Sequence, residues 1–439
     1  MIIHLKDNKY RKNKKLTDFL KSELDGVFYT GHASILVRLD KKKYLFDYIN
    51  NINFYRNSWI FFPSQVIDKR LFDIDGIFVS HIHQDHYDPS LLRKYQKKKI
   101  PIYILYGRES FKRSLKKENI KAKFLPIKKK TYIDKNTWIY GCLHEYNDID
   151  SSMVISNDKL SVYHGNDNFI TKKSLKPLKK AVGNIDIACV PFAYINYYPY
   201  LMDGISKKES KSEANRIENL FMSYGIEQSK ILNPKIIIPF GSNLFHIDNP
   251  TSAMNKGVAT PVDFVEYAKK NNKTLSKNYK TMLSGSFCLK KADLIKTSYE
   301  NISQKKFNNA LINYTRKRKR LTVNSSKIKR NKITESNLKN IHMKISKNPN
   351  KLDHNIVLSS KTEQNKKIII NLKNDIVEYK KILKIPENSH YFIVEDNEFN
   401  LWLNNKITFE EVLGTRRFRY NRNPNIYRVE INQIYTNFL

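Results

Sequence analysis

A loop rich in histidine and aspartate follows directly after an apolar run in the stretch IFVSHIHQDHYDP, residues 77 to 89. The apolar residues predict a short buried strand that ends where the loop begins. Residues two apart at the end of a strand point the same way, so His81 and His83 can present their imidazoles to one metal ion. Asp85 and His86 lie one turn further and can address a second ion. Four such residues in this order favour a metal site over solvated or core histidines.

The types of ligand restrict the metal only in part. Neutral imidazole and carboxylate suit zinc, manganese and iron without separating them well. The three cysteines, Cys142, Cys189 and Cys288, are scattered, which argues against a thiolate cage and against a disulfide framework. We therefore expect two divalent ions as cofactors, with zinc favoured and manganese or iron as alternatives.

The order H-x-H-x-D-H resembles the signature of the metallo-β-lactamase superfamily. Three further stretches resemble the superfamily in the same order along the chain: FYTGHASILVRLDKKKYLFD from Phe28, YGCLHEYNDIDSSMVI from Tyr140 and LSVYHGNDNF from Leu160. The resemblance covers roughly residues 26 to 291. It implies an α/β fold, the four-layer αββα sandwich of that superfamily, here with a basic linker and a small C-terminal α+β extension.

The resemblance also implies ligands that lie outside the histidine loop. His144 stands where the superfamily has the third histidine of its first site, so it would join His81 and His83 on one ion. Asp167 stands where the superfamily has the carboxylate that bridges both ions. Asn166 occupies the position just before it, but an ionised carboxylate can bridge two cations and an amide cannot readily do so.

The second site would take Asp85, His86 and one more histidine. His246 fits by its late place in the chain, and His164 is the alternative beside the bridging aspartate. His32, in the Gly-His-Ala-Ser turn, is expected to stabilise the turn rather than to line the site.

A narrower resemblance is to the branch that contains the metallo-β-lactamase-like part of CMP-N-acetylneuraminate hydroxylase. It rests on NSWIFFPSQVIDKRLFDIDGIFVSHIHQDH, on the Asn-Asp pair in HGNDN, and on ILNPKIIIPFGSNLFHIDNP. The animal enzyme also carries a Rieske cluster, which needs paired Cys-x-His and Cys-x-x-His ligands. Three dispersed cysteines cannot supply them, so the hydroxylase activity does not transfer.

The length of 439 residues predicts two or three domains. We expect a basic lead-in over 1–25, the metallo-β-lactamase-like domain over 26–295, a basic polar linker or helical extension over 296–366, and a small α+β unit over 367–439. The aromatic loop PFAYINYYPYLM, residues 191 to 202, is interpreted equally well as a substrate wall or as core.

The formal net charge of +37 is the other conspicuous property. Lys, Asn, Ile and Tyr are over-used along the whole chain, which favours a compositional origin over a nucleic-acid footprint. The densest basic block, Tyr314 to Lys332, is interpreted as linker. With neither a secretory signal nor an apolar run long enough to span a membrane, we expect a cytoplasmic protein. The sequence does not indicate its oligomeric state.

The expected function is therefore that of a metallo-β-lactamase-fold hydrolase with a binuclear site. A metal-bound hydroxide would attack an ester, phosphoester or lactone, with Asp85 as a catalytic residue that orients the nucleophile. The substrate is expected to be small and anionic, sugar- or nucleotide-like. Two alternatives stay open: a di-iron oxidase or oxygenase on the same ligands, and a less favoured nucleic-acid-processing or binding protein that uses the basic tail.

Overall fold

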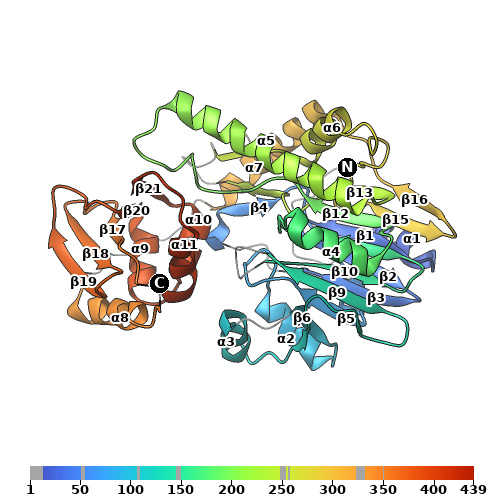
Figure 1. Cartoon of the computed structure of the whole chain (residues 1–439), viewed down its shortest axis with the longest axis horizontal. Helices are drawn as coiled ribbons and strands as arrows, with labels where there is room; N and C mark the ends of the chain where they lie inside the picture. Colours follow the sequence, from blue (N-terminus) through green and yellow to red (C-terminus); the bar gives the residue numbers. More distant parts are fainter. Residues whose placement is uncertain are drawn as a thin grey trace.

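The computed structural model describes residues 13–50, 55–105, 109–144, 150–247, 254–255, 258–322, 332–349 and 351–439. Residues 1–12 of the predicted lead-in, and 323–331 and 350 of the predicted linker, lie outside the described residues. A sandwich of sheets and helices precedes a smaller C-terminal unit along the chain, and the two lie side by side (Figure 1).

The first sheet of the sandwich joins antiparallel and parallel strands. Strands β1 to β3 are antiparallel, and β3, β5, β6 and β7 are parallel. Asp40 and Lys41 connect β2 to β3 with positive φ at both positions, as a tight hairpin turn requires. In spatial order the strands are β16 (Leu294–Ser298), β15 (Phe287–Lys291), β1 (Gly26–Gly31), β2 (Ser34–Leu39), β3 (Lys42–Phe46), β5 (Gly76–Val79), β6 (Ile102–Leu105) and β7 (Lys123–Leu125).

The second sheet is also mixed. Strands β11, β12 and β13 are parallel, and the strands from β8 to β11 are antiparallel. In spatial order they are β13 (Ile236–Phe240), β12 (Ile187–Pro191), β11 (Ser161–His164), β10 (Ser151–Ser156), β9 (Trp138–Leu143) and β8 (Thr131–Tyr132). Two mixed sheets within one domain confirm the predicted α/β class.

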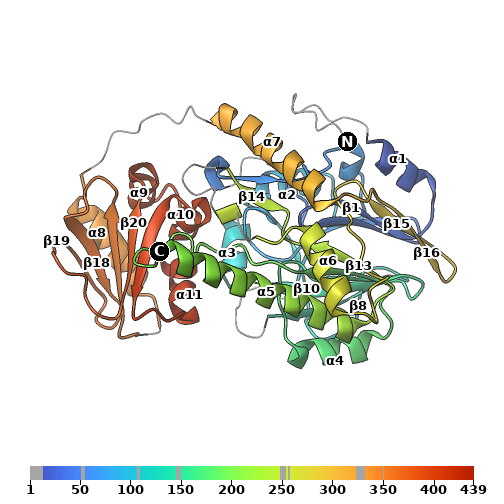
Figure 2. The same cartoon turned by 90° about the horizontal axis from the view of Figure 1, so that it is seen from above.

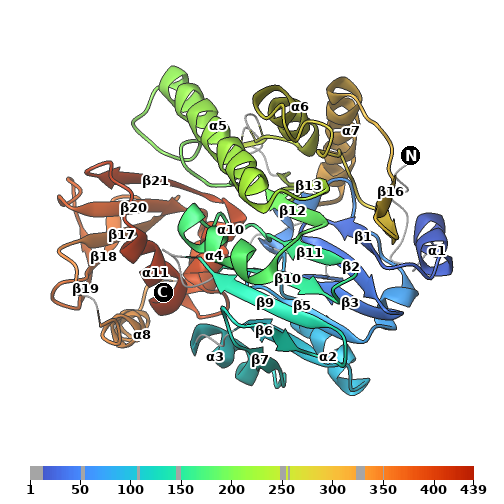
Figure 3. The same ribbon diagram turned by 45° about the vertical axis from the view of Figure 1, so that its right-hand side comes forward.

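Three apolar cores define the layers of the sandwich. One core lies between the sheets and contains Val37 and Phe78 from the first and Ile155 and Ile238 from the second. Outside the first sheet pack α1 (Lys14–Lys21), α2 (Pro89–Lys97) and α3 (Glu109–Lys117). Outside the second pack α4 (Lys172–Val182), α5 (Lys207–Leu232) and α6 (Pro261–Asn271). Figure 3 shows the helices on the two outer faces, so the order of layers is αββα.

The C-terminal unit consists of one sheet and the helices that accompany it. Its sheet has the order β19 (Ile376–Lys381), β18 (Lys366–Asn371), β17 (Asn355–Ser360), β20 (Ser389–Val394) and β21 (Phe418–Asn423). Its helices are α8 (Glu335–Ile345), α9 (Asp396–Leu403), α10 (Phe409–Thr415) and α11 (Val429–Phe438). Strand β17 and helix α8 lie within residues 296–366, the stretch expected to be a basic polar linker or a helical extension. The Lys- and Asn-rich composition of this stretch hides the short buried strand IVLSS.

The two parts share one core. Strand β4 (Trp59–Phe61) pairs with β14 (Leu244–His246), and their apolar side chains pack with those of α10 and β20. The buried carboxylate of Glu398 accepts from Arg56 at 3.2 Å and from Arg417 at 2.9 Å. These contacts fix the C-terminal unit against the segment that precedes the histidine loop.

Helix α7 (Gln304–Thr322) runs from the sandwich towards the C-terminal unit. Figure 2 shows this course of α7. Its Phe307 and Tyr314 pack against Phe62, in a core that also contains Phe245 of β14. The first half of the predicted linker is thus a docked helix. Over the described residues, no helix combines the length and apolar character needed to cross a membrane.

Candidate metal centre

The histidine loop begins where two parallel strands end. Asp47, just after β3, accepts hydrogen bonds from the Ser80 amide at 2.7 Å and from the Ser80 hydroxyl at 2.6 Å. Because β3 and β5 are parallel neighbours, their carboxyl ends meet and bring these residues together. Asp47 therefore fixes the start of the loop that carries the candidate ligands.

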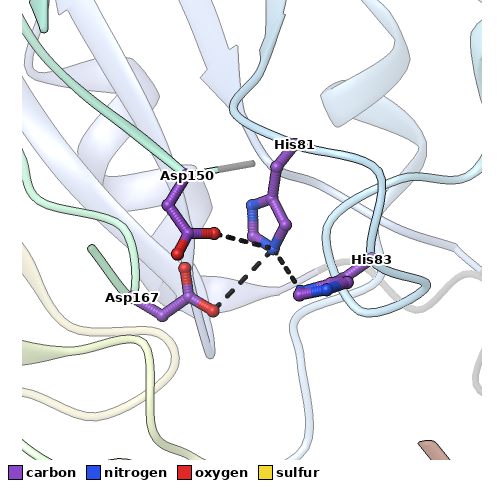
Figure 4. Close-up of side chains that lie close together, drawn as sticks. All are labelled: His81, His83, Asp150 and Asp167. Atoms are coloured by element: carbon purple, nitrogen blue, oxygen red, sulfur yellow. Dashed lines mark hydrogen bonds and ion pairs between the residues drawn. The ribbon is translucent and has the colours of Figure 1, made fainter. Parts of the chain in front are cut away.

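The first candidate site gathers His81, His83, Asp150 and Asp167 (Figure 4). One ligand atom from each lies within 4.8 Å of all the others. His81 Nε2 is 2.7 Å from His83 Nδ1, 3.8 Å from an Asp167 oxygen and 3.9 Å from an Asp150 oxygen. Two imidazoles and two carboxylates facing one point match the ligands that zinc, manganese or iron takes.

The second candidate site gathers His32, Asp85 and His86. His32 Nε2 lies 3.1 Å from Asp85 Oδ2, which lies 3.5 Å from His86 Nε2. The Asp167 oxygen that faces His81 also lies 3.6 Å from His86 Nε2. Asp167 thus stands between the two groups, in the position that a bridging carboxylate would need.

Each histidine of the loop has its other ring nitrogen held by a neighbour. Asp47 Oδ2 lies 3.1 Å from His86 Nδ1, and Ser80 Oγ lies 2.9 Å from His81 Nδ1. Glu410 Oε1, on α10 of the C-terminal unit, lies 3.1 Å from His83 Nε2. Partners of this kind orient metal-binding imidazoles and fix their tautomers.

The atoms that face the centre fit a pair of cations. His86 Nε2, which lies 3.5 Å from Asp85 Oδ2 and 3.6 Å from Asp167 Oδ2, is buried and has no hydrogen-bond partner in the described part of the chain. Leaving such an atom unsatisfied costs roughly 1–3 kcal/mol. A bound cation would satisfy it, so the ligand set and its orientation fit a binuclear site.

Burial and neighbouring groups shift the pKa values of the candidate ligands in different directions. Burial opposes ionisation of Asp85, but the charge of His86 and the hydrogen bond from His32 hold its pKa well below the usual range. Burial lowers the pKa of His81 well below its usual value. Burial also disfavours protonation of His83, yet the hydrogen bond to Glu410 and its charge raise the pKa of His83 to about 9.

The other predicted ligands lie outside both groups. The His144 amide donates to the Asp150 carbonyl at 3.1 Å, at the end of β9. His246 Nε2 lies 3.0 Å from the Thr415 carbonyl oxygen, and the ring meets Trp59 edge-on. Neither histidine belongs to the two groups of candidate ligands.

His164, the alternative to His246, is also placed apart. Its Nε2 lies 3.0 Å from the Ala33 carbonyl oxygen, and its ring stacks on Phe46 at 5.0 Å. His32 instead stands beside Asp85 and His86. Sequence reasoning gave His32 a structural role in its turn, and its φ of +49° fits that role as well.

A cavity of about 290 Å³ opens over the candidate sites. His83, Asp85, Asp150 and Asp167 line one part of it. Residues 193–197, within the aromatic loop that sequence reasoning left open between substrate wall and core, line another part. The remaining wall comes from Tyr55, Trp59 and Leu244 of the sandwich part and from α10, α11 and the segments next to these helices, so the C-terminal unit helps to enclose the site.

No family model matches the chain. A protein of Mycolicibacterium smegmatis (strain ATCC 700084 / mc(2)155), described as a Rieske 2Fe-2S iron-sulfur protein, is 26% identical over 211 residues, which cover 43% of this chain and 40% of that protein. The chain thus matches less than half the length of that relative. The three cysteines here are all free and buried.

Several solved structures show a distant similarity of fold. Igni18, a metallo hydrolase of the archaeon Ignicoccus hospitalis KIN4/I, is 13% identical, with a TM-score of 0.39 over 63% of this chain and 99% of that one. CmlA, a diiron beta-hydroxylase of Streptomyces venezuelae, is 14% identical, with a TM-score of 0.39 over 63% and 54%. YhfI of Bacillus subtilis, a metallo-beta-lactamase fold protein, is 13% identical, with a TM-score of 0.31 over 50% and 86%.

The predicted resemblance to the metallo-β-lactamase superfamily is confirmed by the chain's own features. Two mixed sheets face one another between helical layers, and the H-x-H-x-D-H loop follows the end of β5.

Proposed function

We propose that the chain is a metal-dependent hydrolase that holds two divalent ions, with zinc favoured over manganese or iron. The observation that carries this proposal is the pair of adjacent His/Asp groups, with Asp167 between them, in the wall of a cavity. A purely structural cluster would have little reason to leave a buried ring nitrogen, His86 Nε2, without a hydrogen-bond partner in the described part of the chain.

The distances favour one assignment of ligands. The first ion would take His81, His83 and Asp150, and the second would take His32, Asp85 and His86, with Asp167 shared. His144 and His246 stay predictions from the resemblance, and neither belongs to the two groups.

The metals, when bound, would lower the pKa of a water and stabilise negative charge that develops on the substrate. The chain's own residues would hold the reacting groups. The Tyr55 hydroxyl donates to Asp85 Oδ1 at 3.1 Å and so fixes the carboxylate. Burial raises the pKa of Tyr55 well above its usual value, which keeps it a donor. Asp85, held ionised in this way, would orient the nucleophile.

The reaction we propose is hydrolysis of an ester, phosphoester or lactone in a small anionic substrate. Purified protein should hydrolyse at least one of a chromogenic phosphodiester, a carboxyl ester and a lactone, and a chelator should abolish the activity. Elemental analysis of the same sample identifies the metal. Two irons per chain, with oxygen consumption and without hydrolysis, would turn the assignment to oxidase or oxygenase chemistry.

The choice between Asp150 and His144 can be tested directly. Asp150→Ala should lower the bound metal from about two ions per chain to about one, because it removes a ligand of the first site. His144→Ala, a change in the same hairpin, should keep both ions. Elemental analysis after dialysis measures the difference, and the reverse result would restore the ligand set that the resemblance implied.

Metal uptake should depend steeply on pH. In the metal-free protein the His83 pKa is about 9, so near neutral pH this imidazole carries a proton that a metal must displace. Affinity should therefore rise with pH towards about 9 and fall as the solution is acidified, by about tenfold per pH unit for each proton released. Zinc titrations at several pH values, with proton release followed by an indicator dye, measure this. A zinc affinity that does not change with pH would contradict a raised pKa of His83 in the metal-free protein.

A further inference from the structure

Arg416 is a charged residue of the cavity that the proposed reaction does not use. It follows α10 with a left-handed backbone, and Nη1 donates to the Leu413 carbonyl at 2.6 Å. Nη2 donates to the Ile195 carbonyl at 3.1 Å. The guanidinium carbon lies 5.2 Å from the centre of the Tyr197 ring and 5.7 Å from that of Trp59. The fork is therefore held in a fixed plane by two carbonyls and two aromatic rings.

The hydrogen-bonding capacity of this guanidinium is only partly used. An arginine has five N–H donors, and its Nε is here buried without a partner in the described part of the chain. Over the same residues, no carboxylate oxygen lies within 4.0 Å of Arg416. The neighbouring Arg417, by contrast, is paired with Glu398 at 2.9 Å.

The positive charge of Arg416 exceeds what the carboxylates of the cavity wall can balance once two divalent cations are bound. Among the described residues, the carboxylates that line the cavity are Asp85, Asp150, Asp167 and Glu410. Two divalent cations would balance these four negative charges. The positive charge of Arg416 would then have no counterpart, and a buried charge without a counterpart is costly.

We propose that Arg416 is the anchor for an anionic oxygen group of the substrate, a phosphate or a carboxylate. This assignment rests on the proposed function, since it takes the reacting bond to lie at the metals and the anionic group to lie at the guanidinium. Arginine suits the role because its planar fork can donate two parallel hydrogen bonds to either group. The C-terminal unit would thereby determine which substrates the sandwich hydrolyses.

The size of the cavity limits the substrate. About 290 Å³ lies at the lower end of the roughly 300–1,000 Å³ range of small-molecule pockets. A compact molecule that carries one anionic group fits this space better than a polymer. The aromatic walls from Tyr194 and Tyr197 would face the part of the substrate between the anion and the reacting bond.

The test measures binding of inorganic phosphate and of acetate to the metal-loaded full chain by calorimetry. Arg416→Gln should weaken binding of at least one of the two anions by about tenfold or more, as loss of a hydrogen-bonded charge does. Arg417→Gln is the matched control, because it removes the same charge one residue away and outside the cavity wall. It should change either affinity by less than about twofold. Which of the two anions loses affinity in Arg416→Gln identifies the group that the anchor prefers.

Metal content, measured on the same samples, separates the two proposals. If the wild-type protein took up no metal and Arg416→Gln still weakened phosphate binding, the hydrolase proposal would fall. The proposal that Arg416 binds an anionic group would then remain. Unchanged binding of both anions in Arg416→Gln would overturn the anchor, even if the variant melts earlier, because Arg416 would then serve only to join the two units. If that variant does not fold, Arg416→Lys replaces it. The loss of the planar fork should weaken binding by about threefold or more, and an unchanged affinity would overturn the proposal.

Discussion

Asp167→Ala should abolish hydrolysis and reduce the bound metal from about two ions per chain to about one or none. The reason is its position, since one Asp167 oxygen lies 3.8 Å from His81 Nε2 and 3.6 Å from His86 Nε2. Without the carboxylate, both sites lose a ligand and the two cations lose a negative charge between them. Elemental analysis after dialysis, together with the hydrolysis assay, measures both effects.

Two further variants make the Asp167 result specific. Asp167→Asn keeps the shape of the side chain but not its charge, so it should bind more metal than the alanine variant and less than the wild type. Asp40→Ala removes an aspartate that pairs with Lys159 at 2.7 Å, away from both candidate sites, and should keep the full metal content. If Asp167→Ala retained both ions and its activity, the shared-ligand arrangement would be wrong.

The part of the site that could be predicted from the sequence is the part that is local in the chain. His81, His83, Asp85 and His86 are nearly consecutive, so a strand followed by a loop is enough to bring them together. Asp167 could be placed by resemblance, because it follows the end of its own strand. Each of these residues follows closely after the end of a strand, so the local course of the chain is enough to place it at the site.

The residues that sequence reasoning missed depend on contacts between distant segments. His32 reaches Asp85 from 53 positions away, and its own turn already offered a sufficient reason for a histidine. Asp150 is one of several acidic residues in HEYNDID, and nothing in the spacing selects it. Its place just before the buried strand SSMVIS was the available signal, because a carboxylate at a strand end can face a site at the sheet edge.

The fold shows the same division. Apolar runs such as IFVS and IIIPF predicted the strands of the sandwich, and the resemblance supplied the order of its layers. The composition of residues 296–366 predicted a basic polar linker or a helical extension, which allows for helices α7 and α8 but not for strand β17. The shared core between β4, β14 and α10 could not be anticipated, because its residues are short apolar runs separated by hundreds of positions.

The contribution of the C-terminal unit to the metal centre gives the second large effect. Glu410→Gln should weaken zinc binding at the first site by about 10- to 100-fold, the usual cost of losing a partner that orients a metal ligand. The Glu410 carboxylate lies 3.1 Å from His83 Nε2 and is the group that raises the pKa of His83 to about 9. An uncharged amide at this position would hold the imidazole less firmly. The pKa of His83 in the metal-free variant should therefore fall, which nuclear magnetic resonance can follow.

Glu411→Gln is the matched control for this prediction. Glu411 is the next residue on α10, and its carboxylate accepts from Gln84 at 2.7 Å and from the Thr408 amide at 2.9 Å. Glutamine can keep the capping contact, so the replacement should cost less than about 1 kcal/mol of stability, while zinc affinity and the His83 pKa stay near the wild-type values. If both variants bound zinc like the wild type, the C-terminal unit would only cover the cavity. If Glu410→Gln alone lost affinity, the metal centre would extend across both parts of the chain, and the sandwich without its C-terminal unit would be an incomplete enzyme.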